Sequence, residues 1–324
     1  MSIIERVAQL LEPAAQTEPR SFPPRKARAS SELDIIERAL KESNELAPVT
    51  ETGERGMPPA SARGTVEFAP WPSWAEEESK PSRNARTVAV DIERLRQRGM
   101  IAPGGERTAT TESFQRIKRR ILTDVRNPKP NRPANLVLVT SALAGEGKTF
   151  CAINLAISIA LEVDHSVLLV DGDVRKPSVP EVLGFKADKG LMDLLADRRI
   201  DMASVLHKTD IGKLTVLPAG TAQRQTTELL ASDAMRDLLA EMATRYRDRI
   251  IIFDSPPLLQ ASEAGVLASQ MGQVVMVVES GKTAESALKE ALSHVDSTRL
   301  TGLVLNKAAS MGLGSYYGGY GYGP

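Results

Sequence analysis

The sequence predicts an α/β fold in which a mostly parallel sheet is covered by helices on both faces. Short apolar runs alternate with segments of helical periodicity from residue 135 to residue 306, a pattern typical of parallel strands joined by crossover helices. A glycine-containing loop follows the first run, and acidic residues follow two others. Strands are expected at residues 135–140, 166–170, 213–217, 250–253, 273–278 and 302–305, and the clearest helices at 149–161, 227–246 and 282–295.

The loop at residues 141–149 lies between an apolar strand and a helix-patterned segment, as a phosphate-binding loop requires. Gly145 and Gly147 can adopt positive φ at little steric cost, so that backbone N–H groups turn inward around a phosphate at the positive end of a helix. Lys148 is expected to reach the β- and γ-phosphates, and the Thr149 hydroxyl to bind Mg²⁺. An ordinary turn before a helix is the alternative, because Ala142 stands where the usual pattern begins with glycine. With this motif, the predicted fold is of the P-loop NTPase type.

Three aspartates follow two of the apolar runs that are predicted to be buried parallel strands. Asp171 and Asp173 follow residues 167–170, and Asp254 follows residues 250–253. Ligands of open α/β sheets sit at the carboxyl ends of the strands, so these carboxylates are placed to hold Mg²⁺ and to polarise or deprotonate a nucleophile. Any one of them could instead cap the next helix, but three beside one phosphate loop favour the catalytic interpretation.

These motifs resemble those of the bacterial P-loop tyrosine autokinases of exopolysaccharide and capsule assembly. The resemblance runs from about residue 110 to residue 324. It includes a Walker A motif at residues 142–149, a Walker A′ motif of the form DxDxR at Asp171, Asp173 and Arg175, and a Walker B aspartate at Asp254. It is greatest for the subgroup found with exosortase and PEP-CTERM systems, whose separate kinase has an N-terminal extension like this one.

The resemblance implies transfer of the γ-phosphoryl group of ATP to protein tyrosine, with Mg²⁺ as the second cofactor. It implies catalytic roles for Lys148, Asp171, Asp173 and Asp254, and metal binding by Thr149, Asp171 and Asp254. Because tyrosine is mostly protonated at neutral pH, Asp171 or Asp173 is expected to orient the phenol and accept its proton. ATP contacts are expected from Ala144, Gly145, Glu146, Gly147, Lys148, Thr149, Phe150, Arg175 and Asn306.

Two of these assignments leave alternatives open. Arg175 could bind phosphate or a neighbouring carboxylate, and the sequence does not decide between them. Asn306 and Lys307 follow the last predicted strand, where related ATPases contact adenine. A strand-end Asn is as often a turn residue.

The C-terminal tail, residues 311–324, carries most of the tyrosines of the chain. Four of the five, Tyr316, Tyr317, Tyr320 and Tyr322, lie in the last nine residues. The tail is too rich in glycine to hold a helix or strand and too short to build a core. A flexible arm carrying phenols can enter an active site, so these four tyrosines are the expected phosphoacceptors. The alternatives are a low-complexity end or a nucleic-acid stacking tail, but no Arg or Lys lies between the aromatic residues.

Three parts are expected along the chain: an N-terminal extension at residues 1–100, a kinase domain at 101–310, and the tail. Ten of the twenty prolines lie at or before Pro81, and residues 41–86 show neither sustained periodicity nor an apolar face, which is typical of a disordered linker. Residues 3–10 and 35–40 could form short amphipathic helices that dock on a partner. Trp71 and Trp74 form either a docking motif or an incidental cluster in the linker.

Composition excludes several classes of protein. The net charge of zero gives no electrostatic reason to expect nucleic acid as a partner. The single cysteine, Cys151, cannot by itself form a disulfide or a Cys-ligated metal site. No apolar run reaches the length of a membrane span or resembles a signal peptide, so a cytoplasmic protein is expected.

The resemblance also implies partners. These are a membrane-embedded polysaccharide chain-length regulator, which would hold the kinase at the inner membrane, further copies of this chain, and a tyrosine phosphatase.

Residues 111–122 resemble the family's ExxRxxR helix, which packs between subunits of ring-shaped oligomers. Glu112 matches, but Gln115 and Lys118 replace the arginines. Because neither reproduces a planar guanidinium fork, a ring formed through this helix is in doubt. Nearby Arg116, Arg119 and Arg120 either compensate or form a solvated face.

The sequence disfavours two other functions. A partitioning or division-site switch ATPase would carry a lysine early in the loop, in the pattern KGGxGKT, but Leu143 occupies that position. A weakly catalytic scaffold that uses nucleotide only to assemble an export complex is disfavoured by the intact Lys148 and aspartates.

Overall fold

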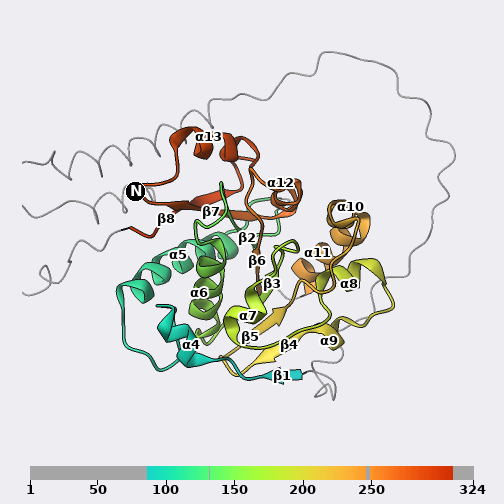
Figure 1. Cartoon of the computed structure of the whole chain (residues 1–324), viewed down its shortest axis with the longest axis horizontal. Coiled ribbons are helices and arrows are strands. Elements are labelled where there is room, and N and C mark those ends of the chain that lie inside the picture. The colour runs from blue at the N-terminus through green and yellow to red at the C-terminus, as the bar shows by residue number, and fades with distance from the viewer. Residues whose placement is uncertain (1–85, 131, 246–248, 309–324) are drawn as a thin grey trace, which may run out of the picture.

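The computed structural model describes residues 86–130, 132–245 and 249–308 (Figure 1). These residues form an eight-stranded sheet with the order β1-β4-β5-β3-β6-β2-β7-β8. The strands are β1 (Arg86–Val88), β2 (Leu136–Ser141), β3 (Ser166–Asp171), β4 (His207–Thr209), β5 (Leu214–Leu217), β6 (Arg249–Asp254), β7 (Gln273–Glu279) and β8 (Leu300–Asn306). Residues 1–85 of the expected N-terminal extension lie outside the described residues, and with them the two amphipathic segments, the two tryptophans and all of the expected linker except Arg86. The tail tyrosines also lie outside the described residues.

The predicted mostly parallel α/β sheet is confirmed. The six strands expected from the apolar runs are present, and their bounds differ from the predicted ones by at most two residues. Strands β1 and β4 were not predicted, because three residues are too few to show an alternating pattern. Strand β4 runs antiparallel to β5, and the other neighbouring pairs in the described sheet are parallel.

Helices cover both faces of the sheet. Since successive residues of a strand point to opposite faces, Val137 and Val139 of β2 pack in the core under α4–α7, whereas Leu136 and Leu138 pack in the core under α8–α13. The helices are α4 (Ile92–Gln97), α5 (Ala109–Arg126), α6 (Lys148–Ala160), α7 (Val179–Leu183), α8 (Leu191–Ala196), α9 (Met202–Val205), α10 (Thr226–Leu230), α11 (Asp233–Arg245), α12 (Ser262–Gln270) and α13 (Glu285–Ser293).

One expected helix is divided in two. The periodicity at residues 227–246 predicts a single helix, but the structure has α10 and α11 with a break at residues 231–232. The hydroxyl of Ser232 accepts a hydrogen bond from the backbone N–H of Met235 at 3.3 Å. A serine in this position satisfies one of the donors that a new helix leaves unpaired, so Ser232 favours a fresh helix start over continuation.

Residues that precede the expected domain start at residue 101 pack on the domain. Strand β1 pairs with β4, the backbone N–H of Val90 donates to Asp210 at 2.9 Å, and the N–H of Ile101 donates to the buried Asn154 side chain at 2.7 Å. The segment also buries Val90, Leu95 and Ile101 in the core under α4–α7. Its docking therefore combines apolar burial with these long-range hydrogen bonds, which leave no local pattern in the sequence.

Helix α5 contains the residues that resemble the intersubunit helix, and Lys118 is tied to its own chain. The Lys118 side chain is buried, its Nζ donates to the carbonyl of Ser158 at 3.3 Å, and it forms an ion pair with Glu162. The hydrogen bond from Lys118 lowers the pKa of Glu162. The Lys118 side chain therefore connects α5 to the last turn of α6. Arg116, Arg119 and Arg120 are exposed on α5.

Asn154→Ala should lower the free energy of unfolding by about 1 to 3 kcal/mol, because it leaves the N–H of the buried Ile101 without its acceptor. The matched control is Asn127→Ala, which removes an exposed side-chain bond to the carbonyl of Thr123 and should cost no more than about 0.5 kcal/mol. Urea denaturation followed by circular dichroism measures both. Equal losses would show that the contact between Asn154 and Ile101 does not anchor the N-terminal segment.

Candidate active site

The predicted motifs lie together at the carboxyl edge of the sheet. Strands β3, β6 and β2 are neighbours in the sheet order and end at Asp171, Asp254 and Ser141. Asp171 and Asp254 are register partners in the parallel pair β3–β6. Adjacent strands lie about 4.8 Å apart, so the topology itself brings these two carboxylates close to each other.

The loop between β2 and α6 has the backbone expected of a phosphate-binding loop. Gly145 and Gly147 have φ of 86° and 96°, the left-handed region in which a side chain would be strained. At Gly147 a Cβ would also lie 2.1 Å from the Asn306 amide nitrogen. Gly147 caps α6 without any side-chain hydrogen bond. The first N–H groups of α6 therefore have no competing side-chain cap, and the positive end of the helix dipole faces the loop.

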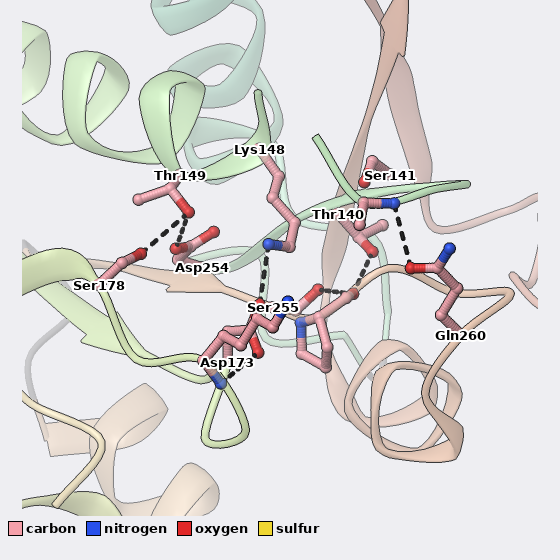
Figure 2. A network of polar contacts seen from close by, with 12 residues as sticks. Thr140, Ser141, Lys148, Thr149, Asp173, Ser178, Asp254, Ser255 and Gln260 are labelled. Atoms are coloured by element: carbon pink, nitrogen blue, oxygen red, sulfur yellow. Dashed lines mark hydrogen bonds and ion pairs between the residues drawn. The ribbon is translucent and has the colours of Figure 1, made fainter. Parts of the chain in front are cut away.

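The Lys148 and Thr149 side chains turn toward the aspartates (Figure 2). Lys148 Nζ lies 2.8 Å from Asp173 Oδ2, and both side chains are largely buried. The Thr149 hydroxyl donates to Asp254 Oδ2 at 2.6 Å. The Walker A, A′ and B residues are thus in direct contact.

The buried carboxylates of Asp171 and Asp254 are each only half satisfied. Asp171 Oδ2 accepts the backbone N–H groups of Ser178 at 2.9 Å and Val179 at 3.0 Å. The other oxygen, Oδ1, has no hydrogen-bond partner in the described structure, and the same holds for Asp254 Oδ1. A buried polar atom without a partner is costly. Such atoms at a ligand site indicate where an absent ligand binds.

Burial also changes the acidity of both groups. It raises the pKa of Asp171 to about 6, against the opposing effect of the N–H groups from Val179 and Ser178. It raises the pKa of Asp254 to about 7, against the opposing effect of Lys148. Charge repulsion from Asp173 adds to the rise in the pKa of Asp171, and charge repulsion from Asp171 adds to the rise in the pKa of Asp254. A cation placed between them would reverse both effects.

The donor set fits Mg²⁺ bound together with a nucleotide. The described residues contain no group of three or more His, Cys, Asp or Glu side chains that could hold a metal ion by themselves. Asp173 is paired with Lys148, which leaves Thr149, Asp171 and Asp254 near the loop. Mg²⁺ commonly takes one or two carboxylates, a hydroxyl, waters and substrate phosphates, and the two unpartnered oxygens match that requirement.

Arg175 forms an ion pair within the chain. Its Nε lies 3.0 Å from Glu263 Oε1, at the start of α12. Glu263 is 1 % exposed, whereas the Arg175 side chain is 61 % exposed. Of the two alternatives left open by the sequence, the structure has the carboxylate, while most of the guanidinium still faces solvent.

The remaining predicted ATP contacts have protein partners of their own. The N–H of Ala144 donates to the Gln260 side chain at 3.3 Å. Glu146 is buried and accepts bonds from the N–H of Leu143 and the hydroxyl of Thr283. The Phe150 ring packs against Phe114 at a centroid distance of 6.3 Å. Glu146 and Phe150 therefore offer a ligand their backbone N–H groups and not their side chains.

Asn306 contacts the loop. Its amide donates to the carbonyl of Glu146 at 2.8 Å, so in this structure it supports the loop, and contact with adenine stays a prediction. Lys307, beside it, donates to the carbonyl of Gly145 at 2.7 Å. The sequence did not indicate the supporting residues Ser178, Gln260, Glu263 and Thr283, because each lies in a different segment and acts through a long-range contact.

This loop, its lysine and the aspartates at neighbouring strand ends define a P-loop ATP-binding protein. A family model described as an AAA domain matches residues 135–308, more than half of the chain.

Curated relatives define the class more narrowly. The tyrosine-protein kinase YwqD of Bacillus subtilis is 32% identical over 228 residues, which cover 69% of this chain and 92% of YwqD. The tyrosine-protein kinase wzc of Salmonella typhi is 27% identical over 76% of this chain, which spans only 33% of wzc. Among solved structures, the chimerical protein CapA2B2 matches with a TM-score of 0.56 and 25% identity, over 71% of this chain and 97% of that protein. The chain belongs to the bacterial tyrosine-protein kinases.

No helix in the described part of the chain is long and apolar enough to cross a membrane.

Asp254→Asn should stabilise the ligand-free protein, and more at pH 8 than at pH 5. The pKa of Asp254 rises from 3.8 to about 7 on folding. The folded protein therefore binds more protons than the unfolded chain between these values, and its free energy of unfolding falls as the pH rises through them. A neutral amide avoids that loss, which is at most about 4 kcal/mol.

Urea denaturation at pH 5 and pH 8, without nucleotide or Mg²⁺, measures this difference. Asp188→Asn, at an exposed position, is the control and should leave the pH dependence unchanged. If Asp254→Asn is no more stable than the parent at pH 8, burial of this carboxylate does not destabilise the protein.

Proposed function

We propose that this protein transfers the γ-phosphoryl group of ATP to Tyr316, Tyr317, Tyr320 and Tyr322 of its own C-terminal tail and thereby regulates the polymerisation and export of an exopolysaccharide. The observation that carries the proposal is the direct contact of Lys148 with Asp173 and of Thr149 with Asp254 at the N-terminus of α6. The kinship with tyrosine-protein kinases supports the choice of acceptor. Within that family we propose the exosortase-associated subgroup.

Phosphate binding follows from the loop itself. The N–H groups of residues 144–150 and the positive end of α6 would hold the β- and γ-phosphates, and Lys148 would add a positive charge. Mg²⁺, held by Thr149, Asp171 and Asp254, supplies charge neutralisation of the phosphates when bound. Arg175, with most of its guanidinium exposed, would meet phosphate or an incoming acidic group.

Asp173 is the better of the two candidates for orienting the phenol. Both oxygens of Asp171 have other assignments, because Oδ2 accepts two backbone N–H groups and Oδ1 is proposed to face the metal. Asp173 is held by Lys148 alone among the charged side chains of the described site. When Lys148 moves its contact to phosphate, the Asp173 carboxylate becomes free to accept the phenol proton.

The rival switch ATPase has no support in the loop. Leu143, at the position of the signature lysine, packs against the core, and its N–H donates to Glu146 at 2.8 Å.

We further propose the organisation and partners that the family resemblance implies. The kinase domain would span residues 101–310, together with the docked segment from Arg86, and would phosphorylate the tail of a neighbouring copy. A membrane-embedded chain-length regulator would hold it at the cytoplasmic side of the inner membrane, and a tyrosine phosphatase would reverse the modification.

Lys148→Met should reduce tail phosphorylation by about a hundredfold or more, because it removes the charge nearest the developing γ-phosphate while keeping a similar volume. Asp173→Asn should also impair transfer but bind ATP better than Lys148→Met. Phosphosite mapping by mass spectrometry after incubation with ATP and Mg²⁺ measures transfer. Lys129→Met, at an exposed position outside the site, should behave like the parent. Unchanged tail phosphorylation in Lys148→Met would contradict the proposed function.

Replacing Tyr316, Tyr317, Tyr320 and Tyr322 together with Phe should give a protein that binds ATP, stays unphosphorylated and remains associated. The phosphorylated parent should elute as a smaller species on size exclusion, because each phosphotyrosine adds close to two negative charges and the arm would be repelled from a site that holds phosphate and aspartates. Tyr246→Phe, at the one tyrosine outside the tail, should phosphorylate normally. Phosphate found mainly on Tyr246, or identical elution of both forms, would contradict the tail as acceptor and switch.

A further inference from the structure

Two consecutive residues at the end of β8 hold the outer side of the phosphate loop. The Asn306 amide donates to the carbonyl of Glu146 at 2.8 Å, and Lys307 Nζ donates to the carbonyl of Gly145 at 2.7 Å. Both acceptors belong to the turn that Gly145 and Gly147 shape with their positive φ. Strand β8 is an edge strand of the described sheet, beside β7, so the loop is held by the sheet as well as by its own helix.

These contacts determine where the loop's donors point. In a trans peptide the C=O and N–H of one unit point in opposite directions. The carbonyl of Gly145 shares its peptide unit with the N–H of Glu146, and the carbonyl of Glu146 shares its unit with the N–H of Gly147. Holding the two carbonyls outward therefore turns the N–H groups of Glu146 and Gly147 inward, toward the anion that a phosphate loop binds.

Lys307 is itself held in an unusual geometry. It is the one non-glycine residue with positive φ in the described chain, at 57°. Such a residue persists where its surroundings fix it, and backbone strain of this kind concentrates at functional sites. Its Nζ also pairs with Glu279 Oε2 at 3.2 Å, and Glu279 is the register partner of Asn306 in the pair β7–β8.

A second lysine pairs with Glu279, which allows the effect of the loop contact to be separated from the effect of the ion pair. Lys282 Nζ lies 3.3 Å from the same Glu279 oxygen, but within the described residues it makes no hydrogen bond or ion pair with the loop, and it is largely exposed. The loop is fastened to this segment elsewhere, through the bond from Thr283 to Glu146. Lys282 therefore shares the ion pair of Lys307 without sharing its contact with the Gly145 carbonyl.

We propose that Lys307 is a positioning residue of the phosphate loop, which holds the N–H of Glu146 toward the phosphates by binding the Gly145 carbonyl from outside. The inference rests on the proposed ATP site and extends it to the residue from which the chain continues toward Tyr316, nine positions later. A shift of the chain at Lys307 then changes the affinity for nucleotide, and bound nucleotide in turn favours one position of the chain at Lys307.

The test compares Lys307→Met with Lys282→Met in the full chain. Fluorescent ATP binding with Mg²⁺ should weaken by about five- to tenfold in Lys307→Met and by less than about twofold in Lys282→Met. In tail phosphorylation Lys307→Met should raise KM for ATP in the same proportion and leave kcat at saturating ATP nearly unchanged, because bound phosphates re-form the loop. Lys307→Arg, which keeps a long cationic donor, should recover most of the affinity.

Hydrogen exchange gives a readout that does not depend on activity. Without nucleotide, the amides of residues 145–147 should exchange faster in Lys307→Met than in the parent, and at the parent's rate in Lys282→Met. Parent-like affinity and exchange in Lys307→Met would overturn the proposal. Equal losses in both variants would also overturn it, since they would assign the effect to Glu279.

The two proposals can fail separately. A parent that binds ATP but does not phosphorylate its tail contradicts the proposed function, while the comparison of the two lysine variants still decides the role of Lys307. A parent that binds no ATP overturns both.

Discussion

The burial of negative charge at the ends of the two central strands is the constraint on which the site depends. Asp171 and Asp254 are paired in register between β3 and β6, both are fully buried, and no lysine or arginine pairs directly with either carboxylate in the described structure. Backbone N–H groups stabilise one and the Thr149 hydroxyl the other. Folding energy from the two apolar layers has to offset this cost. Within the described residues, the ligand-free protein therefore holds two buried carboxylates that no cation neutralises, and the Mg²⁺ and phosphates that we propose for this site would supply the missing interactions.

The loop that supplies the phosphate donors is supported by segments distant in sequence. Gln260 contacts it after β6, Thr283 after β7, and Asn306 and Lys307 at the end of β8. These strands lie on both sides of β2 in the sheet. Parallel strands all end at the same edge, so each following segment can contribute one contact. The geometry of a short glycine loop is thus a property of the whole carboxyl edge of the sheet, which explains why two glycines and a lysine alone do not specify it.

The sequence predicted the elements whose signals are local. Runs such as 250–253, apolar on both faces, identified the buried parallel strands, and the order of strand, glycine loop and helix identified the phosphate site. Strand β4 was missed because three residues with an exposed Lys208 show no pattern. The break before Asp233 was missed because an amphipathic period can continue across a capping serine. Long-range pairs such as Arg175 with Glu263, or Lys118 with Glu162, could not be predicted, since their partners lie 88 and 44 positions away. The tail tyrosines lie outside the described residues.

Helix α6 has a consequence for where the enzyme can change shape. Ten consecutive residues of this helix, Cys151–Ala160, are buried, so it is enclosed on all sides by the sheet, α5 and the segment before it. A cylinder enclosed in this way cannot tilt or slide without opening close-packed contacts along its length. Lys148 and Thr149, at the start of this helix, are therefore held in fixed positions. Conformational adjustment during turnover falls to the other side of the site, where Asp173 and Arg175 sit on a connection between β3 and a five-residue helix. Helix α6 therefore forms the fixed side of the active site, and the connection after β3 forms the side that can adjust.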